Sequence, residues 1–155
     1  MEFHLFDTPL GQMAVASEDG RSLSRLWLPE QPLPRLMPRS TPLLLQAEGQ
    51  LLEYLSGTRR QFALPLAPHG TAFQLRVWAA LCRIPWGQTR SYAQLAQAAN
   101  CPKGYRAVGM ANHANPLPIL IPCHRVIASD GSLGGYAGGT GLKAALLALE
   151  GVCCK

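Results

Sequence analysis

The sequence lacks any long apolar run and carries few charges. Its aliphatic runs, such as Leu43–Leu45 and Ile119–Ile121, fall far short of the ~18 residues that a transmembrane helix needs. Hydrophobic residues make up 48% of the 155 residues and charged residues 15%, which excludes a disordered protein and favours one domain or two small ones. Residues 1–4 contain no hydrophobic block, so we expect no signal peptide and a cytoplasmic protein.

The five cysteines lack the spacing of a disulfide framework or of a metal site. Their number is odd and no two of them have C-x-x-C spacing. This usage is typical of a reducing compartment rather than of a small secreted domain. The four histidines show no finger-type spacing with the cysteines, so we expect neither a metal nor another cofactor.

The second half of the chain is almost free of acidic residues. Residues 69–155 hold eight lysines and arginines against only Asp130 and Glu150, whereas residues 1–68 hold six against seven acids. A basic excess of this kind attracts a polyanion, because lysine and arginine neutralise phosphates and release counterions. A basic face that only aids solubility is the alternative, and charge alone does not decide between them.

The order of apolar and turn residues predicts an α+β fold in two domains. Alternating apolar residues between turns predict a small antiparallel sheet over residues 3–28. A helix is expected from Pro42, at its first position, to a stop at Ser56-Gly57. The proline-rich stretch 64–70 coincides with the change in charge, so we place domains at 1–68 and 69–155.

The second predicted domain is mostly helical and contains two short helices joined by a tight turn. One follows a cap at Ser91 and the other spans about residues 103–113, with Val108 and Met110 among its apolar members and Arg106 facing solvent. On a basic background, such a pair indicates a helix-turn-helix of winged-helix-like type. Further helices are expected after Thr71 and over about 142–150.

The sequence Cys123-His124-Arg125 is the most suggestive chemical motif. Neighbouring histidine and arginine side chains lower the pKa of a thiol, and the thiolate is the nucleophilic form. Adjacent side chains diverge, so His124 would reach the sulfur through a water or a sharp turn, with Asp130 or Glu150 orienting its ring. The alternative is a buried, inert thiol beside an incidental imidazole.

The stretch from Ile121 to Ile127, IPCHRVI, resembles the active-site signature of the O6-alkylguanine-DNA alkyltransferases, or methylated-DNA–protein-cysteine methyltransferases. The resemblance covers about residues 70–151, and the first 68 residues fit the family's smaller ribonuclease H-like α/β domain. Further matches in the family's order are Phe73-Gln74, Val77-Trp78, Ile84 to Gly87, Thr89, Ser91-Tyr92, Arg106 to Gly109, Asn115-Pro116, Gly135-Tyr136 and Lys143 to Glu150.

The resemblance implies an alkyl transfer in which Cys123 is the acceptor. It further implies that His124 deprotonates Cys123 through a water, that Glu150 holds the imidazole and that Asn115 braces the turn. Tyr92 would bind and protonate the leaving guanine, which suits a phenol because its pKa of ~10 keeps it a donor. The protein would act once, as a DNA repair transferase and most simply as a monomer, on double-stranded DNA containing O6-alkylguanine.

The resemblance also assigns DNA and base contacts. The helix-turn-helix would enter the minor groove, where Arg106 fills the space left by an everted base and Ala107 and Gly109 let the helix lie close to the backbone. Tyr92 and Arg125 are further DNA-binding candidates. The expected pocket residues, partly in a lid over residues 134–139, are Val126, Tyr136, Ala137 and Gly138.

The small residues Ala137 and Gly138 in this lid predict tolerance of adducts larger than methyl and of O4-alkylthymine. Asn112 departs from relatives that place an apolar residue at its position. Three other functions stay open: a non-catalytic lesion reader, whose class carries tryptophan where Cys123 stands, a Cys-His hydrolase, and a helix-turn-helix transcriptional regulator.

Overall fold

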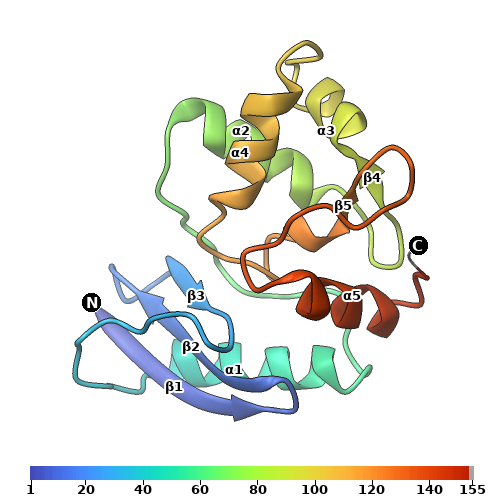
Figure 1. Cartoon of the computed structure of the whole chain (residues 1–155). Coiled ribbons are helices and arrows are strands. Elements are labelled where there is room, and N and C mark those ends of the chain that lie inside the picture. The colour runs from blue at the N-terminus through green and yellow to red at the C-terminus, as the bar shows by residue number, and fades with distance from the viewer. Residues whose placement is uncertain (154–155) are drawn as a thin grey trace. The chain divides into compact units, whose positions relative to one another are not determined.

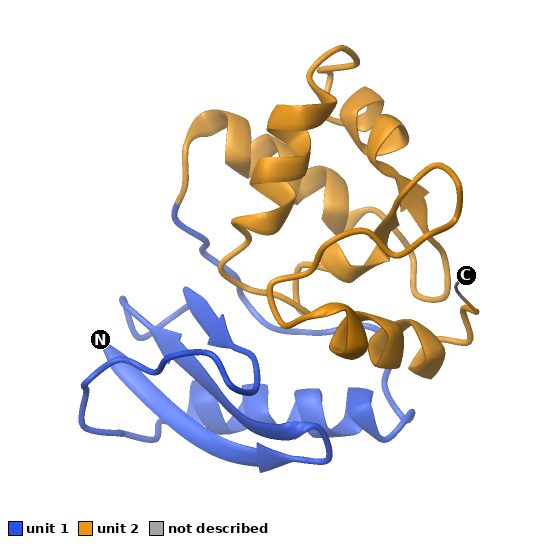
Figure 2. Ribbon diagram, in the orientation of Figure 1, with its two compact units in different colours: residues 1–69 blue, residues 70–155 orange. Residues whose placement is uncertain are grey.

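The protein divides into two compact units, which Figure 2 colours separately. The computed structural model describes residues 1–153, and the first unit ends at His69 and the second begins at Gly70. Their strands and helices make an α+β fold, as predicted. Among residues 1–153, no helix combines the length and the apolar character needed to cross a bilayer.

The first unit consists of a three-stranded sheet and one helix (Figure 1). Strands β1 (Glu2–Thr8), β2 (Gly11–Ser17) and β3 (Arg25–Trp27) pair antiparallel in the order β1-β2-β3, which confirms the predicted sheet. Helix α1 (Pro42–Leu55) packs against β1 and β2. It begins where predicted, because the Thr41 hydroxyl accepts a hydrogen bond from the first turn.

The described part of the second unit, residues 70–153, contains four α-helices. They are α2 (Ala72–Cys82), α3 (Tyr92–Ala98), α4 (Tyr105–His113) and α5 (Thr140–Leu149). Helices α3 and α4 pack on each other and on α2, and they form the predicted helix-turn-helix (Figure 1). The Trp78 indole of α2 donates a 2.8 Å hydrogen bond to the Ala111 carbonyl of α4, which fixes this packing.

Capping boxes explain where two of these helices begin. The Thr71 hydroxyl and the Gln74 carboxamide each bind the other residue's backbone N–H at the start of α2. Ser91 and Gln94 make the same reciprocal pair at the start of α3. Each box satisfies two N–H groups that a helix terminus otherwise leaves without partners, so the chain enters both helices at defined residues.

A parallel pair of two-residue strands connects the helix-turn-helix to the cysteine motif. Strand β4 (Arg90–Ser91) pairs with β5 (Val126–Ile127), with Arg90 opposite Val126. A single 3₁₀ turn, η1 (Cys123–Arg125), precedes β5 directly. The pairing therefore brings the start of α3, where Tyr92 lies, next to the turn that carries Cys123.

One expectation for α4 was wrong. Met110 was expected on the apolar face of the helix, but its side chain is 74% exposed, whereas Val108 is fully buried. Two residues further along a helix of 3.6 residues per turn, Met110 points to the opposite side from Val108. Arg106 is exposed, as predicted.

Candidate active site around Cys123

The turn that presents Cys123 is held by a buried carboxamide. The Asn115 Nδ2 donates a 2.8 Å hydrogen bond to the Ile121 carbonyl, and its Oδ1 accepts a 3.0 Å bond from the Leu117 backbone N–H. Between them, Ile119 has a φ of 73°, in the left-handed region that β-branched residues rarely adopt. Asn115 thus makes the bonds expected of a residue that braces this strained turn.

Cys123 is buried, and its thiol is harder to ionise than the sequence suggested. The side chain is 4% exposed, and burial raises the pKa of the thiol to about 11. A hydrogen bond from Asn115 and the positive charge of Lys143 lower this pKa, but their effect is smaller than that of burial. The expectation that neighbouring charges hold the pKa of Cys123 low was therefore wrong, and thiolate formation requires a nearby proton acceptor.

His124, the residue that follows Cys123, forms a buried pair with Glu150. The His124 Nε2 lies 2.8 Å from the Glu150 Oε2, and both side chains have no exposed surface. Burial lowers the pKa of the imidazole, and the hydrogen bond to Glu150 partly opposes this shift. A ring that is neutral at pH 7 is able to accept a proton, and the carboxylate stabilises the imidazolium that results.

Arg125 belongs to this buried cluster and not to a DNA-binding surface. Its Nε and Nη2 donate to the two Glu150 oxygens at 2.8 and 3.0 Å, and its Nη1 donates to the Ile84 carbonyl at 2.7 Å. The residue is only 7% exposed, so its guanidinium is not available to a phosphate. The expectation that Arg125 contacts DNA was wrong: the adjacent residue in a 3₁₀ turn faces the protein interior instead.

A fully buried lysine joins the cysteine turn to the loop over it. The Lys143 Nζ donates a 2.6 Å hydrogen bond to the Val126 carbonyl and a 3.2 Å bond to the Gly135 carbonyl. Sequence reasoning assigned this residue no role. Its burial could have been inferred from the sequence, because Lys143 precedes Leu146 and Leu147 by three and four residues. At this spacing it shares their buried face of α5.

Tyr92 faces the loop that covers the thiol. Burial, and secondly the charge of Cys123, raise the pKa of the Tyr92 phenol, so the hydroxyl remains a donor at neutral pH. A Cβ on Gly134 would lie 2.9 Å from that hydroxyl, and Gly134 has a φ of 71°. Glycine is therefore required for this close approach of the loop to Tyr92.

A small cavity adjoins Cys123, and a larger hollow opens beside it. The cavity has a volume of about 10 Å³, room for about one water, and its lining includes Tyr136 and Ala137 as predicted. The predicted pocket residues Val126 and Gly138 are not in its lining, and the Val126 side chain is fully buried. The hollow has a volume of about 630 Å³ and is lined by Tyr92, Arg106, Gly109, Met110, Asn112, His113, Ala114 and Gly135.

The hollow therefore gathers Tyr92, Arg106 and Gly109, three of the predicted DNA-contacting residues, whereas Ala107 is exposed on α4 outside its lining. Its volume is within the range of small-molecule sites. Asn112, His113 and Gly135 line both the hollow and the thiol cavity. A group that enters the hollow would reach the thiol past these three residues.

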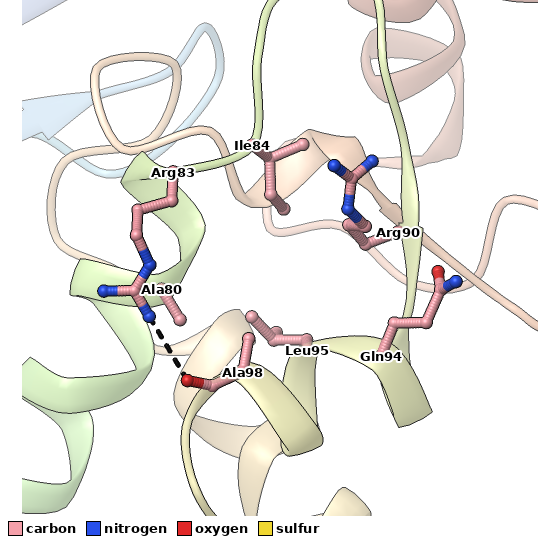
Figure 3. Close-up of a pocket in the computed structure, with 7 residues that line it drawn as sticks. All are labelled: Ala80, Arg83, Ile84, Arg90, Gln94, Leu95 and Ala98. Atoms are coloured by element: carbon pink, nitrogen blue, oxygen red, sulfur yellow. Dashed lines mark hydrogen bonds between the residues drawn. The ribbon is translucent and has the colours of Figure 1, made fainter.

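A separate pocket of about 280 Å³ lies between α2 and α3 (Figure 3). Figure 3 shows Arg83 and Arg90 on opposite sides of it, with the Arg83 Nη2 donating a 3.2 Å hydrogen bond to the Ala98 carbonyl. It shares no lining residue with the thiol cavity and has no cysteine or histidine in its lining. Cys123 and His124 therefore lie outside the lining of this pocket.

Among residues 1–153, no cluster of three or more histidine, cysteine, aspartate or glutamate side chains is arranged to hold a metal ion. The side chains of the site offer a buried thiol, a neutral imidazole held by a carboxylate, and a phenol in the lining of the adjoining hollow. This set suits a displacement in which the sulfur attacks and the phenol protonates the leaving group.

Comparisons with known proteins agree with this geometry. Residues 72–152 match the family described as 6-O-methylguanine DNA methyltransferase, DNA binding domain. The constitutive methylated-DNA–protein-cysteine methyltransferase of Bacillus subtilis is 46% identical over 96% of this chain and 94% of its own length. The Methanosarcina mazei protein of that name is 39% identical over 97% of both chains.

A solved structure covers the same extent of the chain. Mycobacterium tuberculosis OGT, crystallised in complex with DNA, superposes with a TM-score of 0.90 at 41% identity and covers 97% of this chain and 92% of that one. The family match over residues 72–152 spans the cysteine motif and its buried partners. The chain belongs to the methylated-DNA–protein-cysteine methyltransferase family.

Proposed function

We propose that this protein repairs DNA by transferring the alkyl group of O6-alkylguanine to the Sγ of its own Cys123. The observation that carries the proposal is the buried Cys123, which is followed in the chain by the buried His124 of the His124–Glu150 pair and lines a cavity next to the hollow that Tyr92 and Arg106 line. In this proposal Cys123 is the nucleophile, His124 the proton acceptor and Tyr92, in the lining of the adjoining hollow, the proton donor. The membership of the family supports the same reaction.

The transfer is a displacement at carbon. The Cys123 thiol gives its proton to the His124 imidazole, directly or through a water, and the sulfur attacks the alkyl carbon. The new S–C bond forms as the bond between that carbon and the guanine O6 breaks, and Tyr92 protonates the departing base. The phenol regains a proton from the imidazolium, so the products are S-alkyl-Cys123 and unmodified guanine.

Because the pKa of Cys123 is high, the reaction needs a proton acceptor, and we assign this role to the His124–Glu150 pair. With a thiol pKa of about 11, only about 1 molecule in 10⁴ holds a thiolate at pH 7. A neutral imidazole, already bound to a carboxylate, is suited to remove the proton as the reaction proceeds. Glu150 is in turn fixed by Arg125, so we assign Arg125 to positioning.

Access to a base in a duplex requires that the base leave the stack. We assign Arg106, exposed on α4 and lining the hollow, to the space that the everted base vacates. A Cβ added to Gly109 would lie 3.8 Å from the Tyr92 ring, so α4 passes close to Tyr92 at this residue. Ala107 is a small exposed residue on the same helix. Small residues beside Arg106 allow α4 to approach the sugar–phosphate backbone of the minor groove closely.

The thioether product has no easy reverse path, so each molecule acts once. A nucleophilic thiol must also stay reduced, and we therefore place the protein in the cytoplasm. We further propose that the first unit is the family's smaller ribonuclease H-like domain.

The test is a single-turnover reaction with a duplex that bears O6-methylguanine, followed by peptide mass spectrometry. We expect a 14 Da increase, that of one CH₂, on the peptide containing Cys123, in a yield that never exceeds one methyl per protein. The Cys123→Ser variant should show no transfer. Tight binding of the lesion without any added mass would favour a lesion reader, repair beyond one equivalent would favour turnover, and sequence-specific binding of undamaged DNA would favour a regulator.

A further inference from the structure

Asn112 presents a buried hydrogen-bond acceptor that the protein does not use. The residue lies on α4 and is 4% exposed, and its Oδ1 has no hydrogen-bond partner among residues 1–153. A buried acceptor without a donor destabilises the folded protein, so an unsatisfied acceptor calls for an explanation. At the reactive centre, a bound group is able to supply the missing donor.

The orientation of this carboxamide is set by the cysteine itself. The Asn112 Nδ2 lies 3.5 Å from the Cys123 carbonyl, which also accepts the backbone N–H of Val126. A carbonyl oxygen only accepts, so the amide nitrogen must face it and the Oδ1 must point elsewhere. The acceptor therefore belongs to a side chain that contacts the Cys123 backbone directly.

Asn112 also lies on the route to the thiol. It lines the hollow that contains Tyr92 and Arg106, and it lines the cavity that contains Cys123. A base that reaches the sulfur from the hollow must pass this residue. Its Oδ1 has no hydrogen-bond partner among residues 1–153, so a donor on the entering base would supply the partner that it lacks.

The two lesions considered above differ in what they offer to an acceptor. Alkylation at O6 removes the ring N–H of guanine, so the 2-amino group is the only N–H donor left on that base. O4-Alkylthymine has lost its ring N–H and has no amino group. A buried acceptor is satisfied by the first base and left unpaired by the second.

We propose that the Oδ1 of Asn112 accepts a hydrogen bond from the 2-amino group of the everted O6-alkylguanine and thereby selects this lesion over O4-alkylthymine. The inference rests on the proposed function and names the base that the site prefers. It narrows the expectation that the small lid residues admit both lesions: the lid sets the size of the adduct, whereas Asn112 reads the base.

The test compares two duplexes that differ by one amino group. One carries O6-methylguanine and the other O6-methylhypoxanthine, which has hydrogen in place of the 2-amino group, and single-turnover rate constants are measured with limiting protein. We expect the wild type to react at least about tenfold faster with O6-methylguanine, since a lost hydrogen bond to a buried group is worth a factor of that order. In Asn112→Leu and Asn112→Ser, this ratio should fall toward one.

Both rates come from one preparation of each variant, so a lower folded fraction cancels from the ratio. Gln97→Leu is the matched control: it removes an exposed carboxamide from α3, outside the lining of the hollow and the cavity, and should keep the wild-type ratio. A third duplex with O4-methylthymine should react with Asn112→Leu no more slowly than with the wild type.

Equal rates of the wild type with the two purines would overturn this inference, as would a wild-type ratio in both Asn112 variants. Neither result would touch the assignment of alkyl transfer to Cys123. Absence of transfer from every duplex would instead overturn the proposed function, and this inference with it.

Discussion

The two units of the protein place their charged pairs in opposite environments. In the first unit, His4–Glu48, Arg59–Glu53 and His69–Glu18 lie at least partly in solvent, with side chains 12–71% exposed. In the second, His124 and Glu150 have no exposed surface and Arg125 has 8%. Surface pairs contribute little, whereas burying charge is expensive and is retained where chemistry requires it. The contrast locates function in the second unit.

The largest expected effect comes from neutralising one carboxylate in each unit and comparing the losses in the free energy of unfolding. Glu150→Gln leaves the buried Arg125 guanidinium without a charged partner and should lower the free energy of unfolding by about 3–5 kcal/mol. Glu48→Gln, which alters a surface pair with His4, should lower it by at most about 1 kcal/mol. Urea unfolding of both variants measures this, and equal losses would contradict the contrast.

Arg106→Ala is expected to slow alkyl transfer from duplex DNA without slowing the transfer step itself. Eversion of a base costs a few kcal/mol, so loss of the residue that fills the gap should slow transfer from a duplex by about 10–100-fold. Transfer from free O6-methylguanine base, which needs no eversion, should be unchanged. Arg83→Ala, which removes an arginine from the separate pocket, is the control for net charge.

The burial of Cys123 predicts a loss of stability at alkaline pH. The pKa of its thiol is about 11 in the folded protein and 9.0 as the reference value, so between these values the unfolded chain releases a proton that the folded chain keeps. Stability is therefore fully present below about pH 9 and falls as the pH rises toward 11. At pH 10, the wild type should lose about 1 kcal/mol that Cys123→Ser retains. Identical pH profiles in urea unfolding would contradict this.

The smallest expected effect concerns the loop over the cavity. Gly138→Trp adds bulk to the lid, next to Ala137 of the cavity lining, and should slow transfer of a benzyl group several-fold more than transfer of a methyl group. The ratio of the two rates in the same preparation is the measurement. An unchanged ratio would mean that this part of the lid does not limit adduct size.

The helices and the first sheet could be predicted because their signals are local. Thr41, Thr71 and Ser91 cap the helices that follow them, and the alternation over residues 3–28 marks the strands. The pair β4–β5 could not be predicted. Each strand has two residues, too few to show a period, and their pairing joins segments more than thirty residues apart.

The residues of the site could be predicted from the sequence, but the direction of the Cys123 pKa shift and the orientation of Arg125 could not. The family resemblance identified Cys123, His124, Glu150 and Asn115; the structure pairs His124 with Glu150 and places Asn115 against the turn that carries Cys123. The direction of the thiol pKa depends on burial, and the inward orientation of Arg125 depends on Glu150 and on a carbonyl 41 positions away. Neither can be read from neighbours in the sequence, because both arise only when distant segments pack.

The tightness of the space beside Cys123 has a consequence for the protein after it has reacted. A cavity of about 10 Å³ has room for about one water, so a methyl group fixed on the sulfur fills it and a longer chain exceeds it. Overfilling a protein interior lowers the free energy of unfolding by about 1–3 kcal/mol, because neighbouring groups are pushed from their preferred positions. The alkylated protein would therefore unfold more readily than the unreacted protein. Cellular proteases, which cleave unfolded chains, would degrade the alkylated form in preference.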